Sequence, residues 1–298
     1  MLATIVLSAF MRLSQAGLGC DDWPACYGQS LRALQAGAAA PVPVLAPHGV
    51  AAARLAHRVV ASLALVLVLA MVMTTLPSRP VLRRPGLLAL ALLALALGLA
   101  VLGIVTPGAR LPAVVVGNLL GGFAMLALCW RLAWSARPGS APPSVPLAGL
   151  ALVLVVAQVV LGAMVSGSHS ALACQGLMDC ARSLPAGAWD WAALSPWREP
   201  LLSATPPFHA AGALVQLLHR LGAVLVLPAV ALVAWQAWRQ ARRAEAAALL
   251  VLVCTQALIG PLLVGVGLPI ALVLAHNLVA ACMLAALVRL LDGRQHCD

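Results

Sequence analysis

Apolar residues fill long runs along the chain, and short polar segments separate these runs. A helix needs about 20 apolar residues to cross a membrane. Seven runs meet this length; they cover residues 49–76, 86–106, 112–134, 147–166, 207–238, 247–267 and 269–291. An eighth run, from Met1 to about Met11, is shorter. The pattern therefore predicts eight transmembrane helices, of which the first is either truncated or partly missing. No basic segment precedes it, so a cleaved signal peptide is a poor alternative.

Composition supports an all-α, polytopic membrane protein. The sequence is 63% hydrophobic and 9% charged, and its mean hydropathy is +1.03. Such values exclude an ordinary soluble domain. The net charge is +10, and because the sequence contains no lysine, all 18 of its basic residues are arginines. These arginines fall between the apolar runs and do not cover one polar face, so no nucleic-acid partner is expected.

The arginines also predict the orientation of the helices. They occupy every second connection, at Arg79, Arg83, Arg84, Arg131, Arg137, Arg239, Arg242, Arg243, Arg289 and Arg294. Because cytoplasmic loops are enriched in basic residues, these connections and both termini are expected on the cytoplasmic side of a bacterial inner (plasma) membrane. The loops 12–48 and 167–206 and the turns 106–112 and 265–269 then face outward.

Three features recur in the same order in the two halves of the sequence. They are a C-x5-C pair at Cys20–Cys26 and Cys174–Cys180, a His-Arg dipeptide at His57 and His219, and an Xaa-Asn-Leu tripeptide starting at Gly117 and His276. The second copies follow the first by 154, 162 and 159 residues. We therefore predict two repeated four-helix bundles, residues 1–136 and 147–298, joined by a cytoplasmic linker rich in proline and glycine at 137–146.

Two histidines lie deep within apolar runs of the second half. His219 is followed by Arg220 and lies eleven residues after Phe208, whereas His276 lies seven residues after Pro269. A polar group at such a depth costs ~2–3 kcal/mol on insertion scales, so it indicates a functional site. A single histidine there is more often a packed residue hydrogen-bonded to a neighbouring helix. Two histidines at similar depth instead favour a ligand that they share.

Haem iron fits this pair better than zinc or copper. Small-metal sites normally recruit three or four protein ligands, and no cysteine or carboxylate accompanies the histidines within the apolar runs. A haem needs only two axial ligands. His57 suggests a similar site, or its remnant, in the first half. Arg58 and Arg220 either bind haem propionates or satisfy helix carbonyls, and both alternatives stay open.

The outward loops carry the two cysteine pairs. An oxidising compartment on that side favours disulfides between Cys20 and Cys26 and between Cys174 and Cys180, although isolated thiols are the alternative.

The first outward loop resembles that of a known family. Its sequence, Arg12-Leu-Ser-Gln-Ala-Gly-Leu-Gly-Cys-Asp-Asp-Trp-Pro-Ala-Cys-Tyr-Gly28, looks like the first periplasmic loop of the haem A synthases (the CtaA/Cox15 family). The His-Arg helices, the late His-Asn-Leu and the duplication are similar too. The resemblance implies an oxidoreductase that oxidises the C8 methyl of haem O to formyl. It also implies a haem b held by His219 and His276, and a substrate haem at His57.

The sequence departs from the family pattern in the first half. The family usually carries a glutamate three residues before the first histidine, where this chain has Arg54. A second histidine is usual at the position of Gly117 or Asn118. A non-catalytic haem-binding assembly or electron-transfer protein is therefore the alternative, and a transporter is a distant third. Expected partners are a haem O donor (a protohaem farnesyltransferase-like enzyme), the cytochrome oxidase assembly machinery and membrane lipid.

Overall fold

Helices are the only regular elements in the part of the chain that the structure describes. This computed structural model describes residues 1–18, 20, 22–37, 47–77, 83–106, 111–135, 144–174, 179–182, 190–202 and 210–291. The helices are α1 (Leu2–Gln15), α2 (Gln29–Gln35), α3 (Pro47–Thr75), α4 (Arg83–Val105), α5 (Pro112–Ser135), α6 (Ala148–Gly167), α7 (Asp179–Arg182), the 3₁₀ helix η1 (Trp191–Leu194), α8 (Ala210–Arg239), α9 (Arg243–Gly265) and α10 (Ile270–Leu291). The predicted all-α class is confirmed.

Seven of the described helices are long and apolar enough to cross a membrane. These are α3, α4, α5, α6, α8, α9 and α10, so the chain is a multi-pass membrane protein. Their ends lie within four residues of the predicted runs. The helix α1 is apolar but only 14 residues long, which is less than the ~20 residues that a span needs. The eighth spanning helix therefore stays a prediction.

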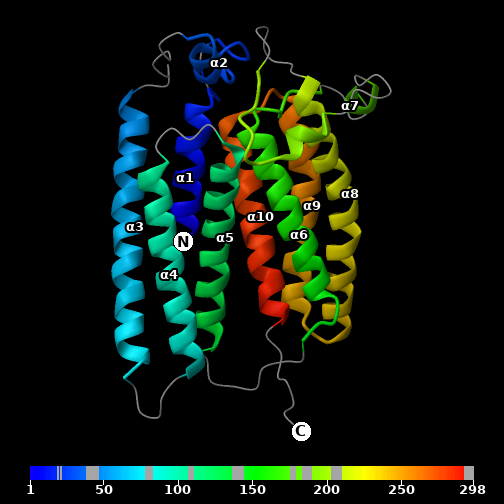
Figure 1. The fold of residues 1–298 in the computed structure, drawn as a ribbon. Coiled ribbons are helices and arrows are strands. Elements are labelled where there is room, and N and C mark those ends of the chain that lie inside the picture. Colours follow the sequence, from blue (N-terminus) through cyan, green and yellow to red (C-terminus); the bar gives the residue numbers. More distant parts are fainter. Residues whose placement is uncertain are drawn as a thin grey trace.

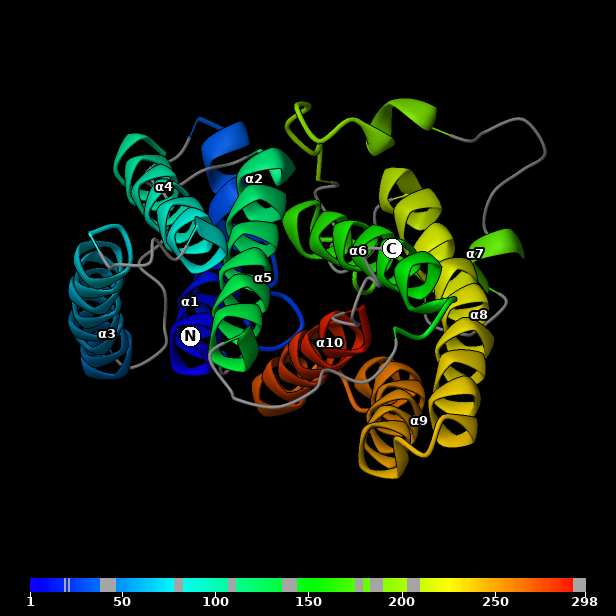
Figure 2. The same cartoon turned by 90° about the horizontal axis from the view of Figure 1, so that it is seen from below.

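The long helices follow the same order of neighbours in both halves. In the first half, α1 packs against α3, α3 against α4 and α4 against α5; in the second half, α6 packs against α8, α8 against α9, and α9 against α10. The second set closes into a ring, because α10 also packs against α6 (Figure 2). This order is what two repeated bundles would produce, although the repeat itself stays a prediction. Of the predicted linker, residues 137–143 lie outside the described residues.

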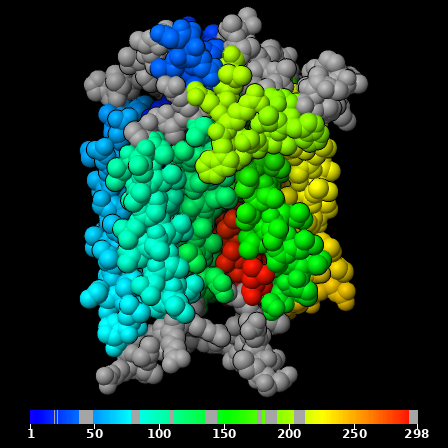
Figure 3. All heavy atoms as spheres, in the orientation of Figure 1, coloured from blue at the N-terminus to red at the C-terminus, as the bar shows by residue number. Residues whose placement is uncertain are grey.

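The two halves share one apolar core. The helix α5 packs against α6 and α10, and α1 also packs against α10. A single cluster of buried side chains joins Phe123 of the first half to Val155 and Leu287 of the second. Near the end of this interface, the guanidinium of Arg289 lies 3.9 Å from the ring centroid of Trp134, which is a cation–π contact between α10 and α5. In the space-filling view the surface of α10 is visible between α5 and α6 (Figure 3).

The connection between α9 and α10 is a tight turn. Gly267 and Leu268 have φ values of +76° and +57°, a conformation that glycine adopts without strain. The N–H of Gly267 donates to the carbonyl of Val264 at 3.3 Å, and that of Leu268 to the carbonyl of Leu263 at 2.7 Å, so the last carbonyls of α9 are satisfied. Pro269 directly precedes the first residue of α10, Ile270, and the two helices run antiparallel.

The arginines on which the predicted orientation depends lie, where the structure describes them, at one end of the bundle. The C-terminal ends of α3, α5, α8 and α10 and the N-terminal ends of α4, α6 and α9 lie at this end, whereas α2 and α7 lie at the other (Figure 1). Arg131, Arg239, Arg242, Arg243 and Arg289 are close to these helix ends; Arg79, Arg137 and Arg294 lie outside the described residues. Arg242 is buried there and donates to Glu245 at 3.2 Å and to the Arg289 carbonyl at 3.3 Å. The side facing the cytoplasm remains a prediction.

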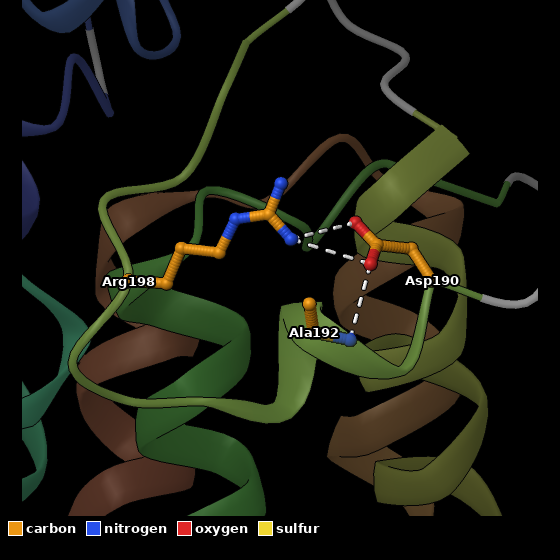
Figure 4. Close-up of polar contacts among 3 residues, drawn as sticks. All are labelled: Asp190, Ala192 and Arg198. Carbon is orange, nitrogen blue, oxygen red and sulfur yellow. Dashed lines mark hydrogen bonds and ion pairs between the residues drawn. The ribbon is translucent and has the colours of Figure 1, made fainter.

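Residues 190–202 form a folded segment over the opposite end of the helices. The carboxylate of Asp190 accepts hydrogen bonds from the Ala192 N–H and from Arg198, which fixes the start of η1 (Figure 4). This ion pair is solvent-exposed, so it stabilises the fold by only ~0.2–1 kcal/mol. The segment is joined to α5 because the Ala113 N–H donates to the Pro196 carbonyl at 2.8 Å. A free amide at the start of α5 is thereby satisfied.

Candidate functional site

The structure brings His219 and His276 together inside the second bundle. They come from α8 and α10, which lie on opposite sides of the ring formed by α6, α8, α9 and α10. Their ring centroids are 6.5 Å apart, and the ring planes make an angle of 68°. Iron–imidazole bonds are about 2 Å long, so two rings that ligate one iron from opposite sides have centroids roughly 6 Å apart. The observed spacing therefore fits two axial ligands of one haem.

Two glutamines from the neighbouring helices contact these rings. The Gln158 amide nitrogen of α6 lies 3.1 Å from His219 Nδ1 and donates to the His219 carbonyl at 2.8 Å. The Gln256 amide nitrogen of α9 lies 3.1 Å from His276 Nε2. His276 Nδ1 is buried without a hydrogen-bond partner. Because an unpaired buried nitrogen is costly, this atom is available to a ligand.

The ligand set suits a haem and is too small for a bare metal ion. Within the described residues, no group of three or more His, Cys, Asp or Glu side chains is placed to hold a metal ion. A tetrahedral zinc site normally needs three or four such ligands. A haem supplies four nitrogens of its own to the iron and takes two from the protein. The pair therefore fits the group that the sequence predicted.

At the positions that the repeat aligns with His219 and His276, the first half offers one histidine in place of two. His57 lies on α3 and is partly exposed, while Arg54 and Arg58 on the same helix are exposed. The Leu102 side chain packs beside Gly117 on α5, because a Cβ on this glycine would lie 3.3 Å from Leu102 Cδ2. The roles predicted for these first-half residues therefore stay predictions.

Arg220 makes a carbonyl contact at the outer end of the second bundle. Its guanidinium donates to the Cys174 carbonyl at 3.1 Å, and the charge of Asp179 also acts on it. The sequence left open whether Arg220 binds a haem propionate or satisfies a helix carbonyl. The partner in the structure is a carbonyl, but it belongs to the outer loop and not to a helix. Propionate binding stays a prediction. The contact ties the helix that carries His219 to the second cysteine loop.

The four loop cysteines lie in pairs at disulfide distance. The Cα atoms are 6.6 Å apart for Cys20 and Cys26 and 5.1 Å apart for Cys174 and Cys180. The predicted pairing is therefore supported over isolated thiols. Gly17 has a φ of +93°, and a Cβ there would collide with the Cys26 carbonyl, so the first loop requires glycine at this position.

The first outer loop covers the end of the second bundle. The ring centroids of Tyr27 and His169 are 5.6 Å apart, and a Cβ on Gly267 in the α9–α10 turn would lie 3.2 Å from the Trp23 indole nitrogen. Tyr27 packs in one buried cluster with Leu172. Burial raises the pKa of the Tyr27 phenol, so this group stays neutral at physiological pH. The loop of one half thus closes the outer side of the site in the other half.

Sequence reasoning missed the two glutamines. Gln158 and Gln256 are polar residues inside apolar runs, the same signal that identified the histidines. Each is also followed four residues later by a glycine, Gly162 and Gly260. This repeated spacing of a glutamine and a glycine could have identified both glutamines from the sequence.

Two comparisons with known proteins give matches for this chain. Residues 1–288 match the family described as "Cytochrome oxidase assembly protein", COX15-CtaA. The chain is also 31% identical over 308 residues to the "Heme A synthase" of Shewanella oneidensis, in a match that covers 96% of this chain and 91% of that protein. Both matches extend over nearly the whole chain.

Proposed function

Because the chain belongs to the COX15-CtaA family of cytochrome oxidase assembly proteins, we propose that it is a haem A synthase. In this role it is a membrane oxidoreductase that oxidises the C8 methyl group of haem O to a formyl group, for cytochrome oxidase biogenesis. The observation that carries the proposal is the pair of His219 and His276, which face each other with ring centroids 6.5 Å apart. Family membership supplies the reaction, and the pair supplies a haem site.

The second bundle is the site of a resident haem b. His219 and His276 would hold its iron, and Arg220, which follows His219 on α8, could pair with a haem propionate. A haem b bound there supplies a one-electron carrier inside the protein. The first outer loop keeps water from this end of the bundle, since Tyr27 and Trp23 pack over it.

The first bundle is the site of the substrate, haem O. His57 is its one candidate iron ligand, and Arg54 and Arg58 are cations on the same helix that can pair with propionates. With glycine at position 117 instead of a second histidine, one face of the iron is left open. An open face suits a substrate that must enter, react and leave. The oxidation of a methyl group releases electrons, so an electron carrier in the adjacent bundle is useful.

A non-catalytic haem-binding protein is the second candidate function. One observation favours it: the position at which the family usually carries a glutamate is Arg54, and a guanidinium cannot accept a proton at neutral pH. In this alternative the protein keeps the haem b of the second bundle and serves oxidase assembly or electron transfer.

The cellular setting follows from the same proposal. The arginine-rich end of the bundle faces the cytoplasm of a bacterial inner membrane, with both termini on that side. The cysteine loops then face the oxidising compartment. A protohaem farnesyltransferase-like enzyme supplies haem O, and the cytochrome oxidase assembly machinery receives the product.

A single expression experiment separates the two functions. The protein is produced with a source of haem O in a strain that lacks its own haem A synthase, and the extracted haems are separated by chromatography. We expect haem A or its hydroxylated intermediate, and we expect both to disappear in His57→Ala. Haem O alone, together with an intact haem b spectrum, would instead establish the non-catalytic alternative.

The resident haem has its own test. His219→Ala and His276→Ala should each abolish or shift the Soret and α bands of the purified protein, because each removes an axial ligand. His169→Ala is the matched control, since this histidine lies in an outer loop against Tyr27. Unchanged bands in both ligand variants would disprove the haem b site.

A further inference from the structure

The two glutamines that contact the histidines occupy equivalent places in the second bundle. Gln158 lies on α6, next to α8, and Gln256 lies on α9, next to α10. In each case the amide nitrogen is 3.1 Å from one ring nitrogen, Nδ1 of His219 or Nε2 of His276. Each imidazole therefore has one nitrogen beside a glutamine, and its other nitrogen remains for a metal.

A short sequence pattern accompanies both contacts. It reads Gln-x-x-[Leu/Ile]-Gly, and its ends are Gln158 and Gly162 in α6 and Gln256 and Gly260 in α9. Residues four apart lie on the same face of a helix, one turn from each other. A Cβ on Gly162 would lie 3.0 Å from Cε1 of the His219 ring, and a Cβ on Gly260 would lie 3.8 Å from Cε1 of the His276 ring. Each helix thus places an amide beside the adjacent imidazole. One turn later it places a glycine, which has no side chain to crowd the ring.

A histidine that ligates a metal needs a hydrogen-bond acceptor. One ring nitrogen binds the metal, so the other carries the proton and donates it to a carbonyl, a carboxylate or water. The Oε1 atoms of Gln158 and Gln256 are acceptors of this kind, and both are buried without a hydrogen-bond partner. In the structure the amide nitrogens face the rings, and that of Gln158 also donates to the His219 carbonyl at 2.8 Å, a hydrogen bond that Gln158 gives up when its oxygen turns to the ring. A half-turn of the terminal torsion exchanges the nitrogen and oxygen of an amide.

We propose that Gln158 and Gln256 are positioning residues of the resident haem site. When the haem is bound, each amide presents Oε1 to the imidazole N–H, fixes the orientation of the ring and raises its basicity as a ligand. A more basic ligand stabilises ferric over ferrous iron, so the pair lowers the reduction potential of the haem. This inference rests on the proposed function, because it requires that His219 and His276 ligate a haem.

The test compares glutamine variants of the purified, haem-containing protein. Gln158→Leu and Gln256→Leu remove the acceptor, and Gln158→Glu and Gln256→Glu keep one. Gln216→Leu is the matched control: Gln216 is a glutamine of α8, 4% exposed, and its amide donates to the Ala171 carbonyl at 3.2 Å and not to an imidazole. The measurements are the haem reduction potential, the electron paramagnetic resonance g-values of the ferric haem, and the rate of haem transfer to apomyoglobin.

The two leucine variants should raise the reduction potential, shift the g-values and speed haem loss on the order of tenfold. The glutamate variants should restore a potential at or below that of the wild type, and the control should match the wild type. Leucine variants with unchanged potentials and g-values would overturn the proposal, as would an equal shift in Gln216→Leu. Where a leucine variant does not accumulate, a raised potential in the glutamate variant overturns it.

Different results would disprove the haem site and the role of the glutamines. If His219→Ala and His276→Ala retain the wild-type haem spectrum, the haem site itself is wrong. If these variants lose the spectrum but the glutamine variants behave as the wild type, only the role of the glutamines is wrong.

Discussion

The two halves of the chain use the same order of helices but carry different polar residues. The second half places a glutamine on each of two histidines. In the first half the repeat spacing of 154 residues puts Thr4 opposite Gln158, and the spacings of 159 to 162 residues put residues 94–97, all alanine or leucine, opposite Gln256. His276 of α10 has Gly117 as its counterpart. The same order of helices can thus rest on apolar packing alone, while each site depends on a few polar side chains.

The halves also differ in how their histidines are enclosed. The second-half pair lies inside a closed ring of four helices and beneath the first outer loop. In the first half, His57 lies on α3 between exposed apolar residues; Leu55 is 64% and Val59 58% exposed. An enclosed site suits a cofactor that stays, whereas a site beside an open helix face suits a hydrophobic substrate that arrives from the membrane. This difference is what the proposed division between haem b and haem O requires.

Filling the space beside His219 should have the largest effect on this comparison. Gly162→Leu inserts a side chain where a Cβ already approaches the ring to 3.0 Å, and overpacking of this kind costs about 1–3 kcal/mol. We expect haem b content or affinity to fall by roughly ten- to a hundredfold. Gly98→Leu is the control, because a Cβ on this α4 glycine meets nothing within 4 Å. Equal losses of haem b in both variants would show that the loss does not depend on the space beside the His219 ring.

Removing the cysteine pairs should have a smaller effect. Closing so short a loop stabilises the folded state by about 2 kcal/mol in the chain-entropy model. We expect Cys174→Ser with Cys180→Ser to destabilise the protein more than Cys20→Ser with Cys26→Ser, because the Cys174 carbonyl also holds Arg220. Thermal inactivation of haem binding measures the difference.

The pairing itself is measured by alkylation of the denatured protein without reductant. Because the sequence has eight cysteines, at most the four outside the loop pairs should react; the exposed Cys254 of α9 serves as an internal positive control. Reaction of all eight would mean that neither disulfide forms.

Changes at Arg54 should have the smallest effect, because this side chain is exposed. Arg54→Ala should weaken haem retention in the first half by a factor of a few, the size expected for an exposed ion pair of ~0.2–1 kcal/mol. Arg54→Glu should raise haem A production, since it restores an acceptor for protons. Haem binding and extracted haems are compared with those of Arg198→Ala, a control in the outer segment. A loss of haem A in Arg54→Glu would contradict the family's route in this protein.

The sequence predicted much of the candidate site because the signals were local. A histidine within a run of some 20 apolar residues stands out without knowledge of the fold, and so His219 and His276 were found. The glutamines were passed over, since an amide in an apolar run is less conspicuous than an imidazole and its meaning depends on the side chain that it faces. Arg220 remained ambiguous for the same reason, because the sequence alone does not say which carbonyl lies beside it.

By itself the sequence determined the membrane class, the seven long helices, the spacing of the cysteine pairs and the presence of a histidine within each of two apolar runs of the second half. Each of these depends on the length and polarity of a continuous segment, which hydrocarbon selects directly. Only the tertiary structure decided that α8 and α10 face each other across a ring, that Gln158 and Gln256 contact the histidines, and that the first outer loop covers the second bundle. These relations join residues far apart in the chain, and they depend on which helix faces pack together, a choice that apolar runs of nearly uniform composition do not encode locally.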